Sequence, residues 1–255
     1  QIGKSAPRSE RVADGLQVLY VFEEGSGDVV RDVAGIGEPI SLKIADTGAV
    51  RWTNDGVTVN APTLIASERP PRRLIEVLKK SKAMTLEAWI TPANATQAGP
   101  ARIVTLSANP LARNFTLGQE GDRFDIRLRT TATSENGVPS LGSSSGTAGS
   151  SPVHVVYSRD SAGNAVVYVE GRESGRLKVA GDLSKWDGGF QFALANELSK
   201  DRPWLGTFHL VAVYDRALSA DDVRKNHAAG PRRDGPSTPS RRVDFNPPAL
   251  TPSGA

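Results

Sequence analysis

The stretch from Leu205 to Gly230 constrains the fold more than any other part of the chain. Its first half, LGTFHLVAVY, places bulky apolar side chains at alternate positions, which predicts a β-strand over 205–214. Both faces of this strand are largely apolar, so we expect it at the centre of a sheet. Ser219 and Asp222 have the spacing of a helix capping box, and Gly230 followed by a proline ends a helix. The sequence therefore predicts a strand, a polar corner and a short helix docked on β-structure.

Similar short strand patterns recur along the rest of the chain. Turns at 120–122 and 160–164 join two pairs of them as hairpins, an apolar stripe over 70–80 predicts a second helix, and the polar stretch 131–152 is expected to be a loop. About a dozen strands, two short helices and no regular alternation of strand and helix indicate an all-β fold, an antiparallel β-sandwich of the jelly-roll type. The expected strands are 16–22, 40–44, 49–53, 57–59, 84–90, 102–106, 115–119, 123–130, 153–159, 165–170, 177–179, 190–195 and 205–214.

Composition divides the chain into three parts. We expect an extended lead-in over 1–14, one folded domain over 15–230, and an extended tail over 231–255, where Pro, Arg and Ser predominate. Much of the formal net charge of +3 comes from four arginines of this tail, and the body has no basic stripe interleaved with aromatic residues. Nucleic acid is therefore not an expected partner.

Missing sequence features exclude several classes of function. The chain has no cysteine, which excludes a disulfide scaffold, a cysteine zinc site and thiol catalysis. No apolar run approaches the roughly 20 residues of a membrane-spanning helix. Its three histidines, His154, His209 and His227, lack the spacing of metal ligands, and no nucleophile elbow or phosphate-binding loop occurs.

Four segments carry a family resemblance: GLQVLYVFEEGSGDVVRDVAGIGEP, MTLEAWITPAN, HVVYSRDSAGNAVVYVEGRE and GTFHLVAVYDRALSADDV. In order and spacing they resemble bacterial LamG-like domains of the concanavalin A-like jelly-roll class, across roughly Gly15 to Gly230. The resemblance implies two curved antiparallel sheets packed face to face. It also implies a location outside the cell, in the periplasm or at the cell surface, with a glycan or another protein as partner.

The resemblance further implies a calcium ion at one rim, although no cofactor is expected to be required. Asp32 lies where similar domains carry a ligating aspartate, and backbone carbonyl oxygens would complete such a site. A second acid usually lies in the closing strand, where this chain has the apolar and basic run Phe208–Val211 instead. The alternative is that Asp32 only caps a turn.

Candidate ligand-binding residues come from consecutive predicted strands and one loop. Because side chains alternate along a strand, four of them would share one sheet face if their strands are neighbours. Planar amides, guanidinium forks and a tryptophan suit a polyhydroxylated or anionic ligand. Alternatively, the same charges satisfy one another and the tryptophan packs at the rim. The candidates are Arg102, Asn114, Arg127 and Arg129 on the strands, and Asn196, Glu197, Asp201 and Trp204 in the loop.

The sequence offers one candidate for a pair of catalytic carboxylates. The segment EGDRFD, over 120–125, superficially matches the E-x-D-x-x-E strand of jelly-roll glucanases, whose alternate acids face one groove. Here a glycine interrupts the segment and only Asp125 clearly enters a strand, so a solvated turn is the alternative.

Three functions follow, in order of preference. The first is a non-catalytic secreted recognition domain that binds a glycan through a concave face or rim loops. The second is a structural subunit of an extracellular filament or envelope complex, with residues 231–255 as a docking arm. The third is a glycoside hydrolase or lyase.

Overall fold

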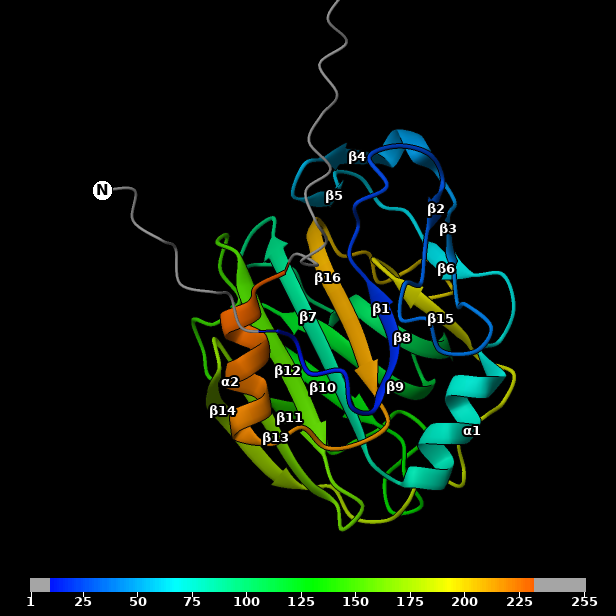
Figure 1. Cartoon of the computed structure of the whole chain (residues 1–255), viewed down its shortest axis with the longest axis vertical. Coiled ribbons are helices and arrows are strands. Elements are labelled where there is room, and N and C mark those ends of the chain that lie inside the picture. Colours follow the sequence, from blue (N-terminus) through cyan, green and yellow to red (C-terminus); the bar gives the residue numbers. More distant parts are fainter. Residues whose placement is uncertain (1–9, 232–255) are drawn as a thin grey trace, which may run out of the picture.

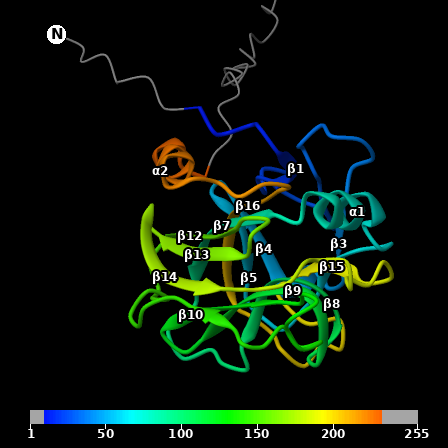
Figure 2. The same ribbon diagram turned by 90° about the horizontal axis from the view of Figure 1, so that it is seen from below.

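The computed structural model describes residues 10–231. Most of the predicted lead-in, residues 1–9, lies outside the described residues, as does the predicted docking arm from residue 232 onward. The described chain is a sandwich of two antiparallel sheets with helices against it (Figures 1 and 2), which confirms the predicted fold class.

The described residues form sixteen strands, two α-helices and one 3-10 helix. They are β1 (Leu16–Tyr20), β2 (Val29–Val30), β3 (Leu42–Ile44), η1 (Thr47–Ala49), β4 (Val50–Thr53), β5 (Gly56–Val59), β6 (Ile65–Ser67), α1 (Arg72–Ser81), β7 (Met84–Pro92), β8 (Ala101–Asn109), β9 (Ala112–Glu120), β10 (Arg123–Leu128), β11 (Leu141–Gly142), β12 (Val153–Arg159), β13 (Asn164–Val169), β14 (Arg172–Lys178), β15 (Gln191–Leu194), β16 (Gly206–Tyr214) and α2 (Ala220–Ala229). Every expected strand is present, with bounds that differ from the prediction by at most five residues. The strands without a prediction are β2, β6 and β11, whose two or three residues are too few to show a period.

The closing strand β16 lies at the centre of its sheet, as its apolar faces predict. Sheet A has the order β14-β13-β12-β7-β16-β5-β4, with β1 also paired to β16. The register against β7 shifts beside His209, which creates a bulge. Before the bulge β16 pairs with β5, and after it with β1. Sheet B has the order β11-β10-β9-β8-β15-β6-β3-β2.

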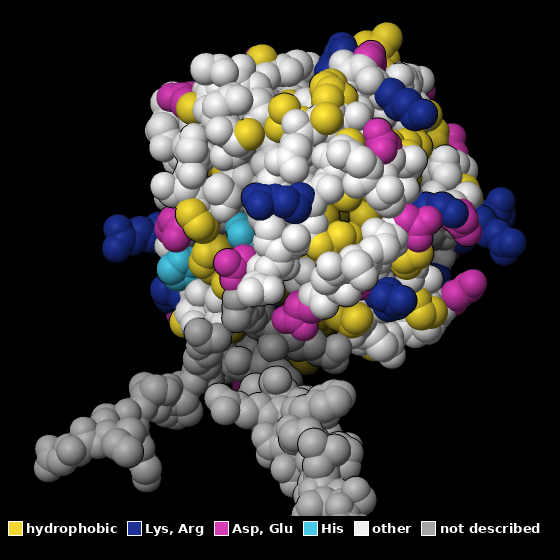
Figure 3. Space-filling view, turned by 90° about the horizontal axis from the view of Figure 1, so that it is seen from above, with side chains coloured by type: hydrophobic (Ala, Val, Ile, Leu, Met, Phe, Trp, Pro, Cys, Tyr) yellow, Lys and Arg dark blue, Asp and Glu magenta, His cyan; other side chains and the backbone are white. Residues whose placement is uncertain are grey.

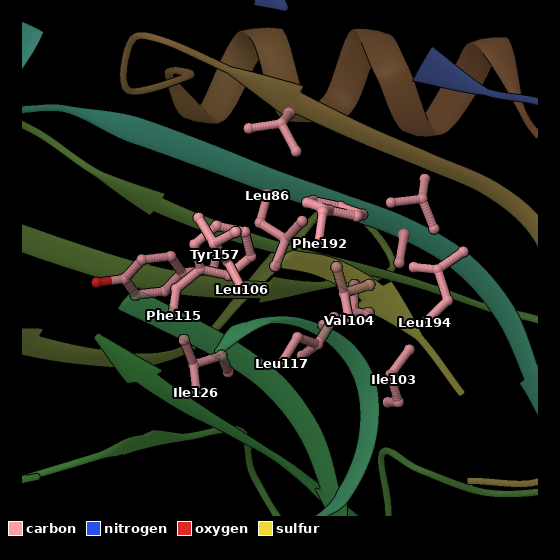
Figure 4. Close-up of a cluster of buried hydrophobic side chains, with 14 of the residues drawn as sticks. Leu86, Ile103, Val104, Leu106, Phe115, Leu117, Ile126, Tyr157, Phe192 and Leu194 are labelled. Atoms are coloured by element: carbon pink, nitrogen blue, oxygen red, sulfur yellow. The ribbon is translucent and has the colours of Figure 1, made fainter. Parts of the chain in front are cut away.

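The apolar faces of the two sheets meet in one core. Figure 4 shows Leu86 and Tyr157 of sheet A together with Phe115, Leu117 and Phe192 of sheet B, and none is more than 2% exposed. The rings of Phe115 and Phe192 meet edge to face, with centroids 6.1 Å apart. Burying side chains of this size contributes roughly 1.5–3 kcal/mol each. Since strand side chains alternate, this core directs the intervening polar residues to the outer faces of the sheets.

The two helices pack on different parts of the sandwich. Helix α2 covers the outer face of sheet A (Figure 2), and it begins at the predicted capping box, in which Ser219 and Asp222 exchange two hydrogen bonds of 3.1 Å. Helix α1 instead places Leu74, Ile75 and Leu78 in the main core. Both predicted helices are thereby confirmed.

A buried carboxylate ties α2 and the start of the described chain to sheet A. Glu87 is fully buried and accepts hydrogen bonds from His154 Nε2 (2.8 Å), Asn226 Nδ2 (2.8 Å) and Tyr214 Oη (3.3 Å), and it forms an ion pair with Arg11. Burial alone would raise the pKa of Glu87, but the Arg11 charge and His154 outweigh burial and lower this pKa to about 2. The carboxylate therefore stays ionised inside the protein.

Candidate functional site

The predicted ligand-binding residues do share one face of sheet B. Strands β8, β9 and β10 are neighbours; Arg102 lies opposite Gly118, and Arg127 opposite Thr116. The amide of Arg129 donates to the carbonyl of Asn114 (2.9 Å), which continues the same row. The loop that carries Glu197 reaches this face, because Arg102 Nε donates to Glu197 Oε2 over 2.9 Å.

Four of the predicted residues are buried rather than open to a ligand. Arg102, Asn114, Asn196 and Glu197 are each at most 1% exposed. The Asn114 amide exchanges two hydrogen bonds of 2.9 Å with the backbone of Asp187, and Asn196 Oδ1 accepts from the amides of residues 197 and 202. With the ion pair of Arg102 and Glu197, these contacts match the alternative of a network that satisfies its own charges.

The assignment of Trp204 to the rim is wrong. Its side chain is fully buried, its ring lies 4.8 Å from that of Phe208, and its Nε1 donates to Gln119 Oε1 over 2.9 Å. A core position suits its large apolar ring, and Gln119 supplies the acceptor that a buried indole N–H needs. Trp204 therefore offers no surface to a sugar.

The remaining predicted residues are partly accessible but already paired. Arg127 Nε donates to Asp125 (2.9 Å), Arg129 forms an ion pair with Glu135 (3.2 Å), and the exposed Asp201 pairs with Arg202 (3.2 Å). Each guanidinium on this surface has a carboxylate beside it.

Arg113, which the sequence reasoning missed, forms no ion pair with a carboxylate of the described residues. It is fully buried on the same side of sheet B, where it donates to Thr116 Oγ1 (3.0 Å), while its Nε has no partner in the described chain. Burial, together with the neighbouring charge of Arg102, lowers the pKa of Arg113 to about 9. Strand alternation alone would place Arg113 on the same face as Phe115. The register of β9 against β8 shifts beside Ser107, the residue that Arg113 pairs with, and no sequence signal marks that shift.

Asp32 fits the role of a turn cap. Its Oδ1 accepts from the amides of Leu19 and Ala34, both at 3.0 Å, and its Oδ2 accepts from the amide of Ile40 at 3.1 Å. At the expected second ligand position, His209 Nδ1 donates to the carbonyl of Asp55 (2.6 Å). Within residues 10–231, no three His, Cys, Asp or Glu side chains form a group that could hold a metal ion. The calcium ion that the resemblance implies stays a prediction.

The acids of the 120–125 segment hold loops in place. Glu120 accepts from the amide of Gly99 (3.1 Å), and Asp122 accepts from the amide of Gly146 (2.9 Å). Asp125 is engaged by Arg127. The predicted hairpin is confirmed, and its acids are arranged as in the solvated-turn alternative.

An open cleft of about 610 Å³ lies at the rim beside β4. Trp52, on this edge strand, packs one part of its ring against the core and leaves another part accessible. Its Nε1 donates to the carbonyl of Gly27 over 3.0 Å, which fixes the ring against the loop after β1. The residues that line the cleft are Gly25, Ser26, Gly27, Asp28, Thr47, Val50 and Trp52.

The polar walls of this cleft are fixed by local contacts. Asp28 lies 3.7 Å from Lys43, and its carbonyl accepts from the amide of Ile44 over 2.7 Å. Thr47 begins the 3-10 helix, which Asp46 caps. Sequence reasoning did not include Trp52 among the candidate ligand-binding residues; its position just before an Asn-Asp-Gly turn on a short strand was the signal of a rim location.

A family model described as the concanavalin A-like lectin/glucanases superfamily (Laminin_G_3) matches residues 46–224. The chain belongs to this superfamily. No curated protein matches it. No helix among the described residues is long and apolar enough to cross a membrane. On the face seen in Figure 3, Lys and Arg side chains are scattered and form no basic stripe.

Several solved structures share the fold at low sequence identity. Trypanosoma rangeli sialidase in complex with sialic acid is 18% identical, with a TM-score of 0.60 over 84% of this chain and 33% of that one. Domain 4 of an extracellular arabinanase from Geobacillus stearothermophilus, in complex with arabinotriose, is 17% identical, with a TM-score of 0.59 over 87% of this chain and 100% of that one. A botulinum neurotoxin type C structure described by its interaction with two gangliosides is 12% identical, with a TM-score of 0.60 over 84% and 51%. The present chain spans about a third of the length of the sialidase chain.

Proposed function

We propose that this domain is a non-catalytic glycan-binding module that acts outside the cell and holds its ligand in the Trp52 cleft. The observation that carries the proposal is an accessible tryptophan ring, fixed by its bond to Gly27, in a cleft of about 610 Å³. A sugar ring stacks its C–H face on such a surface. Binding then costs the protein little conformational entropy, because the tryptophan ring is already oriented.

The walls of the cleft have the chemistry that hydroxyl groups need. Asp28 supplies acceptors, Ser26 and Thr47 supply hydroxyls that donate or accept, and the glycines of the loop expose backbone groups. A glycan can therefore stack on Trp52 while these groups orient its hydroxyls.

The comparisons and the acidic residues support the same proposal. One structural neighbour is a domain of an extracellular enzyme in complex with arabinotriose, and another is described by its interaction with gangliosides. In this chain, Glu120 and Asp122 accept backbone hydrogen bonds from loops, an arrangement that favours binding over glycoside hydrolysis.

Binding of the full chain to an array of neutral and acidic oligosaccharides tests the proposal, with arabinotriose and ganglioside headgroup oligosaccharides included as probes. We expect Trp52→Ala to weaken the binding of retained glycans by about 30-fold, since truncating a central aromatic contact costs about 2 kcal/mol. Trp52→Phe should retain most of the affinity.

The matched control is Leu111→Ala, which removes an apolar side chain that is 71% exposed on the β8–β9 turn. It should leave binding unchanged. Failure of the wild-type chain to retain any glycan, or equal binding by a folded Trp52→Ala variant, would overturn the proposal.

A further inference from the structure

A second cavity, of about 580 Å³, lies where α1 begins. Figure 1 places α1 well away from β4, and the two cavities share no lining residue. The end of β6, the first turn of α1 and the loop before β3 form its walls. The lining residues are Glu38, Pro39, Ile40, Ser41, Ser67, Glu68, Arg69, Pro70, Pro71, Arg72 and Arg73.

Two of the three guanidinium groups in this cavity are unpaired within the described chain. Arg69 and Arg72 are exposed and form no ion pair or side-chain hydrogen bond with any residue of 10–231. This differs from the outer face of sheet B, where Arg127 and Arg129 each have a carboxylate beside them. The donors of Arg69 and Arg72 are therefore open to a ligand.

The third guanidinium is held in a fixed orientation along the wall. Arg73 donates from both terminal nitrogens to Gln17, to its Oε1 (2.8 Å) and to its carbonyl (3.0 Å). Its Nε is buried and has no partner among the described residues. Gly37 lets the loop approach this side chain, because a Cβ on it would lie 2.9 Å from the Arg73 Cδ. Arg73 thus contributes a fixed positive charge.

The cavity also carries acceptors. Glu38 and Glu68 are exposed and form no ion pair with the arginines, and the Ser41 hydroxyl lies on the same wall. Two carboxylates repel any anion, but they also accept hydrogen bonds from hydroxyl groups, so a ligand that carries hydroxyls beside its charge fits this cavity better than a compact inorganic anion. Three guanidiniums and two carboxylates match a ligand that has one anionic group and several hydroxyls.

We propose that this cavity is a subsite for an acidic sugar residue of a glycan. Arg69 and Arg72 bind its carboxylate or sulfate group in fork geometry, and Glu38, Glu68 and Ser41 accept from its hydroxyls. The inference rests on the proposed function for the class of ligand, but it uses different residues, so the two can fail separately.

Affinity electrophoresis of the full chain through gels with polygalacturonate, dextran sulfate or uncharged dextran tests this subsite. The variant is Arg69→Gln with Arg72→Gln. Its control is Arg123→Gln with Arg172→Gln, which removes the same charge from exposed sites outside the cavity. We expect the cavity variant to weaken binding to an acidic polysaccharide at least 10-fold and the control variant less than 3-fold. The comparison of the two acidic gels shows whether the group is a carboxylate or a sulfate.

Three outcomes would overturn the subsite: equal losses in the two double variants, equal retention in acidic and uncharged gels, or no retention in either acidic gel. A loss with Trp52→Ala but not with the cavity variant would overturn the subsite alone and leave the Trp52 cleft standing. If binding of acidic glycans is lost in the Arg69→Gln, Arg72→Gln variant but not in Trp52→Ala, the result would support the subsite and overturn the function proposed for the cleft.

Discussion

The polar network of sheet B and the Trp52 cleft contain similar types of residue, but those residues are buried in the first and accessible in the second. On sheet B, Arg102 and Glu197 are at most 1% exposed and pair with each other, and Trp204 is buried in the core. In the cleft, Trp52 remains partly accessible and is fixed through a single bond to Gly27. Both regions combine an aromatic ring with polar groups, which is the usual composition of a sugar-binding surface.

The difference shows that residue chemistry alone does not identify a binding surface. A polar group whose partners lie within the protein stabilises the fold, whereas one that faces an open cleft remains free for a ligand. Changes on sheet B should therefore reduce stability, and changes in the cleft should reduce binding.

Trp204→Ala should be the most destabilising of these changes. It removes a fully buried ring from contact with Phe208 and leaves Gln119 Oε1 without its donor. Truncating a buried tryptophan costs about 3–5 kcal/mol. Urea unfolding measures this loss. Trp52→Ala should lose clearly less stability, because the Trp52 ring is only partly buried. A larger loss for Trp52→Ala would contradict the division.

Glu197→Gln should reduce stability by about 3 kcal/mol. The substitution keeps the shape but removes the charge that compensates the buried guanidinium of Arg102, 2.9 Å away. Asp201→Asn is the matched control. It removes a negative charge from the same loop, but the ion pair of Asp201 with Arg202 is half-exposed. The cost in stability should therefore stay within about 1 kcal/mol. Equal costs for the two variants would show that burial does not set the importance of this pair.

The sequence predicted the fold well because its signals are local. Alternation of apolar residues identified β16 as a central strand, and the spacing of Ser219 and Asp222 identified the start of α2. The arginines and amides were also placed correctly on one face of sheet B, because strand alternation and hairpin turns fix that arrangement.

The candidate site was harder to predict because exposure depends on distant residues. Trp204 is buried beside Phe208 and Gln119, and Trp52 is oriented by Gly27, which lies 25 residues away in sequence. The periodicity of a sequence does not predict which loop will cover which aromatic ring. The burial of Arg113 is missed for the same reason.

The stability of the domain should fall between pH 5 and pH 3 partly through Glu87. Its pKa is lowered from 4.5 to about 2 in the folded protein, so its contribution is present above pH 4.5 and is lost as the pH falls toward 2. From pH 5 to pH 3 this loss amounts to about 2 kcal/mol. The comparison of urea unfolding for wild type and Glu87→Gln isolates it, since other acids titrate in both proteins. Parallel pH profiles would contradict the assignment.

Arg129→Gln should have the smallest effect, although Arg129 lies in the same polar row as buried Asn114. Its ion pair with Glu135 spans 3.2 Å, but the glutamate side chain is 74% exposed, so water screens the charge when its partner is removed. We expect a loss of stability below about 0.5 kcal/mol and unchanged glycan binding. A double-mutant cycle with Glu135→Gln measures the coupling. A coupling energy as large as the stability loss of Glu197→Gln would show that the accessible edge of sheet B belongs to the buried network. A loss of glycan binding would instead extend the binding surface from the rim onto this sheet.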